Sequence, residues 1–254
     1  NKAGKGFSQD PDVDEAENTF AIKAGDLDVD GDLDLVVGVN FSGQSYALLN
    51  EGGGVFTRQD ILPGQLFSIG DVELGDVDDD GDLDVVAVDW GSTQPYGAPG
   101  DPGGPVRLWL GAGDGTFSDG QVNLPMGLDN VVSWSFDLEL IDFDNDIDLD
   151  VLVSSRGPSY AIALRNDGAG VYLPYPLPAV QNVKGKESNA AFTPIDLTGD
   201  GWLDVVTLQD GGDACVVLDG VQYCGNRSSV LISDGMGQFI DNPGGYWPEP
   251  ANPP

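Results

Sequence analysis

The chain has no histidine, and only two of its 254 residues are cysteine. The lack of histidine excludes catalytic dyads and triads that use imidazole as the base, and zinc sites that need a histidine ligand. Positive charge is also scarce, since 10 Lys and Arg residues stand against 43 Asp and Glu residues and the net charge is -33. Such a chain should repel nucleic acids and anionic membrane surfaces. No apolar run approaches the roughly 18 residues that span a membrane, so we expect no membrane insertion.

Glycine and proline are abundant instead, at 37 and 17 residues. Both interrupt helices and occupy turns, so this density favours many short strands joined by turns over long helices. The apolar content of 40% is enough for the chain to bury a core. We therefore expect an all-β fold.

Much of the acid is Asp in four short segments, called the Asp loops here: residues 26–34, 76–84, 142–150 and 196–204. Each loop has oxygen-bearing side chains at relative positions 1, 3, 5 and 9, and Leu at position 8. Position 7 is placed to offer its backbone carbonyl. The predicted metal ligands are Asp26, Asp28, Asp30, Asp32, Asp34, Asp76, Asp78, Asp80, Asp82, Asp84, Asp142, Asp144, Asp146, Asp148, Asp150, Asp196, Thr198, Asp200, Trp202 and Asp204.

Negative charges at this density repel one another unless a cation lies among them. Oxygen ligands without histidine or cysteine suit a hard cation, Ca²⁺ before Mg²⁺. Positions 1, 3 and 5 let a curled loop aim three oxygens at one centre. Gly31, Gly81 and Gly201 at position 6 allow the sharp turn that this curl needs. The sequence thus predicts up to four calcium sites.

Two loops depart from the pattern. Ile147 stands where Gly is expected, and because a β-branched residue resists positive φ, we expect the third loop to be distorted. Thr198 replaces an anionic ligand and predicts weaker binding in the fourth loop. Ordinary solvated turns would explain one acidic loop, but not four copies with one spacing. An EF-hand would need Glu at position 12, where this chain instead has apolar β-branched runs that predict buried strands.

A second signal keeps step with the Asp loops: a Gly-rich turn followed by an aromatic residue, called the Gly hairpin here. Its copies are residues 52–56, 113–117, 168–172 and 235–239. An apolar run precedes each Gly hairpin, so each repeat should hold four strands, one on either side of the Asp loop and one on either side of the Gly hairpin. Tandem four-stranded units are typical of β-propeller blades.

The Asp spacing and the Gly hairpin together resemble the FG-GAP/VCBS repeat, as in the propeller of integrin α-subunits. The resemblance implies Ca²⁺ in each loop between the first two strands of a blade. It divides the chain into repeats at about 19–65, 66–126, 127–186 and 187–242, with the end of a preceding blade or an arm at 1–18 and a Pro-rich tail at 243–254.

Four repeats are fewer than the about seven blades usual for propellers that this chain resembles. Residues 1–8 look like a fifth Gly hairpin, which indicates that the chain begins within a blade. Three interpretations stay open: a piece of a longer propeller, a compact four-bladed form, or a propeller completed by neighbouring subunits.

Cys215 and Cys224 flank a segment that predicts a hairpin. Cysteines at cross-strand positions suit a disulfide in an oxidising compartment, and we predict one here, with two buried free thiols as the alternative. Asn40 and Asn226 match the acceptor pattern for N-glycosylation, a pattern that also arises often by chance.

The longest insertion, residues 91–105, is expected to be a surface loop. Trp90, Tyr96 and Trp109 in or near it are candidates for a sugar-stacking face, although core aromatics beside a spacer are the more ordinary interpretation. Among the acids outside the Asp loops, nothing marks Glu73, Asp89, Asp137 and Glu139 as a catalytic pair.

These observations lead to one predicted function and two alternatives. The leading prediction is a secreted calcium-binding β-propeller module of the extracellular space or cell surface, not an enzyme, with a structural, adhesive or subunit-assembly role. Its partners would be other protein subunits or a longer parent chain, with glycans as further candidates and no nucleic acid. The alternatives are a carbohydrate-binding, lectin-like propeller and a non-catalytic or catalytic domain of a polysaccharide-degrading enzyme.

Overall fold

The computed structural model describes residues 18–41, 43–61, 67–90, 106–126, 128, 135–155, 161–177, 189–209, 215–218, 221–224 and 229–241. In these residues the structure consists of four four-stranded antiparallel sheets, one two-stranded sheet, and a short 3-10 helix η2 (Gln121–Asn123). The all-β prediction is confirmed.

The first sheet holds β1 (Thr19–Gly25), β2 (Asp34–Val39), β3 (Tyr46–Asn50) and β4 (Phe56–Asp60). The second sheet holds β5 (Ile69–Gly75), β6 (Asp84–Asp89), β7 (Val106–Gly111) and β8 (Phe117–Asp119). The third sheet holds β9 (Leu138–Ile141), β10 (Asp150–Val153), β11 (Ile162–Asn166) and β12 (Tyr172–Pro176). The fourth sheet holds β13 (Asn189–Ile195), β14 (Asp204–Gln209), β17 (Ser229–Ser233) and β18 (Phe239–Asp241), and between β14 and β17 the chain forms the separate pair β15 (Cys215–Leu218) and β16 (Val221–Cys224).

The strands lie in each four-stranded sheet in the order in which they occur in the chain. An Asp loop joins the first strand to the second, and a Gly hairpin joins the third strand to the fourth, as the repeat pattern predicts. The register places Gly25 opposite Asp34 and Gly75 opposite Asp84, so each Asp loop closes its hairpin directly. Antiparallel strands allow such short connections, whereas parallel strands would need long crossovers.

In the second and third sheets the second strand is the most deeply buried. Every residue of β6 and β10 is buried, including side chains on both faces of the sheet. Their sequences are rich in valine and leucine because each of these two sheets packs between two others and has no solvent-facing side at its centre.

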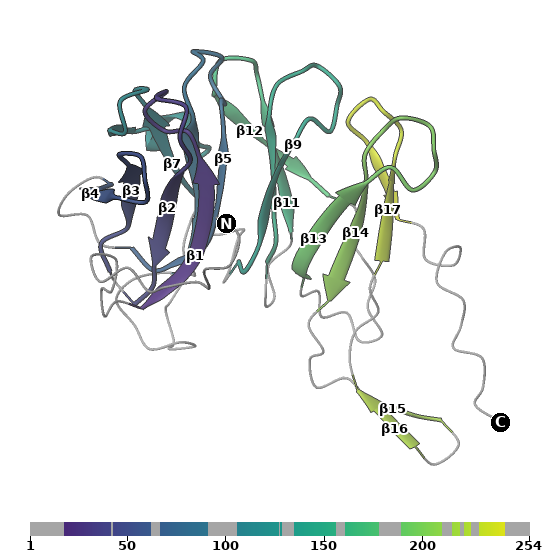
Figure 1. Cartoon of the computed structure of the whole chain (residues 1–254). Coiled ribbons are helices and arrows are strands. Elements are labelled where there is room, and N and C mark those ends of the chain that lie inside the picture. The colour runs from purple at the N-terminus through teal and green to yellow at the C-terminus, as the bar shows by residue number, and fades with distance from the viewer. Residues whose placement is uncertain are drawn as a thin grey trace, which may run out of the picture.

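Three apolar cores lie between successive sheets. The first joins β2 and β3 to β5, β6 and β7, the second joins β6 and β7 to β10 and β11, and the third joins β10 and β11 to β14 and β17. The first strands contact one another in the series β1, β5, β9 and β13, and Figure 1 shows the four sheets side by side along an arc, with the first and fourth sheets at its two ends. The arrangement is that of successive propeller blades whose first strands lie innermost.

No helix in the described part of the chain is long and apolar enough to span a membrane. The predicted arm at 1–18, apart from Asn18, and the tail at 243–254 lie outside the described residues, as does the insertion at 91–105.

Candidate metal centres

The four Asp loops share one backbone path. Position 4 has a left-handed φ in every loop, at Val29, Asp79, Asn145 and Gly199, with values between 59° and 76°. Position 6 is left-handed too, with values between 86° and 96° at Gly31, Gly81, Ile147 and Gly201. Two left-handed residues this close together curl the chain into a ring. The four loops thus share a backbone shape as well as a sequence spacing.

The carboxylate at position 1 holds this ring in shape. In the first loop, Asp26 accepts hydrogen bonds from the backbone N–H groups of Asp30 and Gly31, each at 3.1 Å. The second and third loops repeat both bonds through Asp76 and Asp142. In the fourth loop the bond from position 6 is kept, but the other comes from position 4.

Ile147 does not distort the third loop. It adopts a φ of 86° and donates its N–H to Asp142 at 3.0 Å, as glycine does at this position in the other loops. Its side chain is exposed, so the branched Cβ meets no neighbour and the cost is confined to backbone strain, on the order of 1–2 kcal/mol. The expected distortion is therefore wrong, and the surrounding hydrogen bonds are what hold the residue in a conformation that it disfavours.

The carboxylate at position 9 is buried and ties the loop to the third strand of the same sheet. Asp34 accepts from Leu27 N–H at 2.7 Å through one oxygen and from Asn50 N–H at 2.7 Å through the other. The corresponding clamps are Asp84 on Val77 and Gly111, Asp150 on Phe143 and Asn166, and Asp204 on Leu197 and Ser233. Burial raises the pKa of Asp84 to about 6 and that of Asp150 to about 7.

The carboxylate at position 3 is the unsatisfied member of the set. One oxygen each of Asp28, Asp78 and Asp144 is buried without a hydrogen-bond partner among the described residues. Burial, and then the neighbouring carboxylates, raise the pKa of all three groups. A buried carboxylate oxygen that accepts no hydrogen bond is costly unless a cation contacts it.

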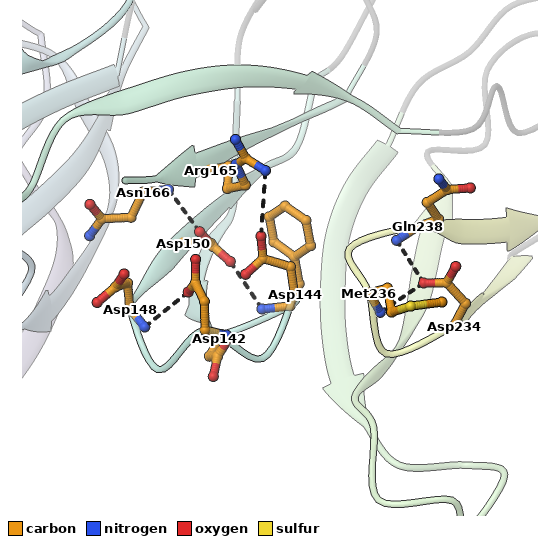
Figure 2. Close-up of polar contacts among 11 residues, drawn as sticks. Asp142, Asp144, Asp148, Asp150, Arg165, Asn166, Asp234, Met236 and Gln238 are labelled. Carbon is orange, nitrogen blue, oxygen red and sulfur yellow. Dashed lines mark hydrogen bonds and ion pairs between the residues drawn. The ribbon is translucent and has the colours of Figure 1, made fainter. Parts of the chain in front are cut away.

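The Asp side chains at position 3 lie close to other carboxylates of their loops. In each of the first three loops, ligand atoms of three Asp side chains lie within 4.8 Å of one another. The three sets are Asp26, Asp28 and Asp34; Asp76, Asp78 and Asp84; and Asp142, Asp144 and Asp146. Figure 2 shows Asp142, Asp144 and Asp150 converging in the third loop. Hard oxygen donors at this separation fit a hard divalent cation.

The fourth loop has no corresponding set of three acids among its described residues, because Thr198 stands at position 3. Asp196 and Asp204 keep their hydrogen bonds to the loop backbone. All residues from 196 to 203 are exposed, whereas positions 1 to 3 of the other loops are half-buried or buried. The fourth loop thus keeps the backbone shape of the others but lacks the carboxylate ligand at position 3.

The difference in burial comes from the next sheet. The Gly hairpin of the second sheet lies on the first Asp loop, where Gly115 donates its N–H to the Leu27 carbonyl at 3.1 Å. Asn166 of the third sheet donates to the Val77 carbonyl at 2.7 Å. Asn145 of the third loop donates to the carbonyl of Gly235, in the hairpin of the fourth sheet, at 3.3 Å. Figure 2 shows this last hairpin, with Asp234, Met236 and Gln238, beside the third loop.

Sequence reasoning named Glu73, Asp137 and Glu139 but missed that they gather with Asp71 and Lys23 along the innermost strands. Glu73 of β5 pairs with Lys23 of β1, and the carboxylate of Asp71 accepts the N–H of Leu138 in the next sheet at 3.1 Å. Asp137 accepts the N–H of Phe192 in the fourth sheet at 2.6 Å. These acids are far apart in the sequence, and only the alignment of the first strands brings them together.

Burial perturbs two of these inner acids most. Burial raises the pKa of Glu139 to about 7 and that of Asp137 to about 6, and like charges on the neighbouring acids add to both shifts. Burial and the neighbouring negative charges thus both disfavour the ionised forms of Asp137 and Glu139.

The aromatic residues proposed to stack on a sugar and the glycosylation candidate Asn40 have different surroundings. Trp109 is buried in the core between the first two sheets, so it is not available to stack on a sugar. Trp90 is half-buried between Phe20 and Phe136, with ring centroids 4.8 and 4.6 Å away, and Tyr96 lies outside the described residues. Asn40 is 3% exposed, which opposes glycosylation in the folded state.

Cys215 and Cys224 lie opposite each other in the β15–β16 register, which confirms the predicted hairpin. Their side chains lie outside what the structure describes, so the disulfide stays a prediction. Asn226 also lies outside the described residues.

Repeated four-stranded sheets, each with an acidic loop between its first two strands, define a β-propeller-type repeat protein. Within that class, the model of the FG-GAP-like repeat matches residues 26–87 and 142–207, just over half of the chain, and the chain belongs to this family. No curated protein matches the chain in a sequence search.

One similar solved structure describes specific recognition of non-reducing terminal N-acetylglucosamine by an Agrocybe aegerita lectin. The similarity has a TM-score of 0.53 at 20% sequence identity and covers 85% of this chain. This chain spans about half of that structure, 49% of its length. At this identity the likeness supports the fold alone.

Proposed function

We propose that the chain is a calcium-binding β-propeller module that acts outside the cell in a structural, adhesive or subunit-assembly role. The observation that carries the proposal is the buried, unpartnered oxygen of Asp28, Asp78 and Asp144 at one position of three loops. A carboxylate oxygen of each of these three residues lies within 4.8 Å of ligand atoms from two further Asp side chains. A bound cation would satisfy these oxygens and relieve the repulsion among them.

The donor set favours Ca²⁺ over other cations. All side-chain donors are carboxylate oxygens, and the loops are open curls without a rigid octahedral frame, which suits Ca²⁺ better than Mg²⁺. The ion would neutralise the negative charge of the Asp carboxylates and would not act on a substrate. Asp26, Asp76 and Asp142 would hold the loop backbone in place, as their hydrogen bonds to positions 5 and 6 do already.

Calcium titration calorimetry on chelator-treated protein tests the proposal. We expect three sites, and a rise in melting temperature when Ca²⁺ is added that EGTA reverses. At 100 times the dissociation constant, each occupied site would add about 2.7 kcal/mol to the free energy of unfolding. Equal molar Mg²⁺ is the control and should stabilise much less. No heat of binding and an unchanged melting curve would contradict the proposal.

The second candidate is carbohydrate binding. It is favoured by the solved lectin structure, which recognises N-acetylglucosamine, and by the group of three aromatic rings formed by Phe20, Trp90 and Phe136. Binding to a glycan array that is lost in Trp90→Ala and kept in Phe41→Ala, an exposed aromatic elsewhere, would support it. Unchanged binding in Trp90→Ala would exclude these rings as the site.

Two sequence-based expectations remain to be tested directly. One is that the chain is not an enzyme, and the other is the alternative that it is a non-catalytic or catalytic domain of a polysaccharide-degrading enzyme. Depolymerisation assays on acidic glycans test whether the chain itself is catalytic.

A further inference from the structure

The contacts between successive sheets follow one rule. The apolar residue at position 2 of an Asp loop meets the aromatic residue of the next sheet's Gly hairpin. Phe143 lies 5.8 Å from Phe239, centroid to centroid, and Val77 shares a buried core with Tyr172. At the first junction Leu27 belongs to the core on which Phe117 packs.

Two further contacts recur at these junctions. A Cβ placed on Gly25 would lie 2.7 Å from Leu83, and one on Gly75 would lie 2.6 Å from Leu149, so the end of the first strand receives the position 8 Leu of the next sheet. Within the hairpin, a Cβ placed on Gly170 would lie 2.9 Å from the Cβ of Asp78. The same close approach joins Gly237 to Asp144, at 2.8 Å. Each junction thus has one half on the Asp loop side and one half on the hairpin side.

Among the described residues, the fourth sheet presents the half on the Asp loop side without a counterpart. Leu197 stands at position 2 of its Asp loop and is 42% exposed, whereas Leu27, at the same position in the first loop, is 3% exposed. Ile195, at the end of β13, is also exposed, as is Leu208 on β14. These side chains belong to a face that the other sheets bury against a neighbour.

The first sheet presents the other half of a junction, the half on the hairpin side. Leu33, at position 8 of its loop, is 63% exposed, and a Cβ placed on Gly54 would meet no atom within 4 Å. The centre of that face, around Val37 and Tyr46, is already buried, so the free part lies at the loop end. Figure 1 places the two halves at opposite ends of the arc.

We propose that a second copy of this chain docks head to tail, placing Leu33 and the Gly hairpin at 52–56 of one copy on Ile195 and Leu197 of the other. The pairing follows from the three internal junctions: Leu33 would occupy the place of Leu83, and Phe56 that of Phe239. The surfaces in contact differ, so the interface is heterologous.

A second copy fits because the chain carries both halves of an interface that it already forms three times. Two copies joined at both ends would bring eight four-stranded sheets together, which lies within the roughly four to eight blades of propellers. The inference rests on the assembly role proposed above and names its partner. It does not require that the Asp loops bind Ca²⁺, so it is tested both with Ca²⁺ and with chelator.

Sedimentation velocity at micromolar to submillimolar protein, in physiological salt, measures the association. We expect a species of twice the mass of the chain. Leu33→Glu and Leu197→Glu should each weaken it about tenfold or more, because each places a charge in an apolar contact. Both side chains are exposed in the single chain, so neither variant should unfold it. Val122→Glu, at a site that is 89% exposed and outside both halves, is the matched control and should associate as the unmodified chain does.

Mixing the two variants separates a head-to-tail interface from a symmetric one. Leu33→Glu keeps an intact fourth sheet and Leu197→Glu keeps an intact first sheet, so the mixture retains one sound contact and should form a mixed dimer. A chain that stays monomeric at all concentrations, a dimer that neither variant weakens, or a mixture that stays monomeric would each overturn the inference. Association that persists in chelator while calorimetry shows no Ca²⁺ binding would contradict the proposed calcium function alone.

Discussion

The third and fourth Asp loops have nearly the same backbone but different surroundings. Phe143 at position 2 of the third loop is 1% exposed beneath the hairpin of the fourth sheet, whereas Leu197 at the same position of the fourth loop is 42% exposed. Asp150 and Asp204 are equally buried and make equivalent clamps to the third strand. Hydrogen bonds within the sheet are therefore enough to fold the loop, while the next sheet decides whether its apolar and acidic side chains are buried.

This difference separates two roles of the same motif. Where the loop is covered, burial removes water from the position 3 carboxylate and creates a demand for a cation. Where the loop is uncovered, water hydrates its acids, and position 3 carries no carboxylate because it is Thr198. The electrostatic character of each loop is thus set across the junction, by residues about 90 positions further along the chain, as with Asn145 and Gly235.

The largest expected effect comes from replacing the side chain at position 2 of each loop by alanine. Phe143→Ala should lower the free energy of unfolding by about 3–5 kcal/mol, because it leaves a cavity in the core between the third and fourth sheets. Leu197→Ala should cost less, about 1 kcal/mol, since its side chain is 42% exposed and leaves no closed cavity when shortened. Urea unfolding, at a concentration where sedimentation finds only the mass of one chain, measures both. Equal losses would show that the fourth loop is covered in solution.

The second test concerns the unpartnered carboxylate. Asp78→Asn should stabilise the calcium-free protein by about 1 kcal/mol, because it removes a charge from a buried acidic set. With Ca²⁺ the same change should destabilise by about 2 kcal/mol through the loss of a ligand. Melting curves with Ca²⁺ and with EGTA show this change of sign.

The neighbouring Asp79→Asn is the control for that test. Asp79 is exposed, belongs to no set of three acids, and has a left-handed φ that asparagine tolerates. It should have the same small effect with and without Ca²⁺. A destabilising Asp78→Asn in EGTA would mean that the carboxylate is satisfied without a cation.

The third test restores the missing ligand of the fourth loop. Thr198→Asp should raise the number of tight calcium sites from three to four, with affinity at that site about tenfold higher, or about 1.4 kcal/mol. Calorimetry gives the stoichiometry directly. Thr57→Asp adds the same charge at an exposed position of β4 and should leave the stoichiometry unchanged. If both variants bind alike, the open surroundings rather than Thr198 limit the fourth site.

Local features of the fold could be predicted from the sequence. Spacing 1-3-5-9 and left-handed positions are properties of consecutive residues, so the loops, their flanking strands and the order within each sheet could be placed from the residues alone. Ile147 shows the limit even of local reasoning, because its cost is real but smaller than the hydrogen bonds that fix it.

Features that depend on contact between sheets could not be predicted. Nothing in residues 26–34 tells that Gly115 covers Leu27, and nothing near Trp109 distinguishes a core ring from a ligand-stacking one. The grouping of Asp71 with Glu139 likewise depends on how the first strands align around the inner side of the arc. Such contacts join residues far apart in the chain, and sequence periodicity carries no information on their partners.

The smallest expected effect concerns the inner strands. Two residues before the end of the strand, β5 has Glu73 and β9 has Glu139, whereas β13 has the uncharged Thr193. Burial first, and then Asp137, raise the pKa of Glu139 from 4.5 to about 7. The native state therefore binds this proton more tightly than the unfolded chain does, so the group's contribution to stability is full below pH 4.5 and is lost as the pH rises through 7. Glu139→Gln should match the unmodified chain at pH 4.5 and be more stable at pH 8.

Solvent screening limits this gain to about 1 kcal/mol or less, because the Glu139 side chain is only partly buried. The quantity to measure is the difference in free energy of unfolding between variant and unmodified chain, at several pH values in EGTA, so that shared effects of the Asp loops cancel. Glu51→Gln, at an exposed position, is the control for removal of one surface carboxylate. A difference for Glu139→Gln that does not change with pH would show that the inner acids are hydrated in solution, so that the junctions between sheets bury apolar side chains without burying charge.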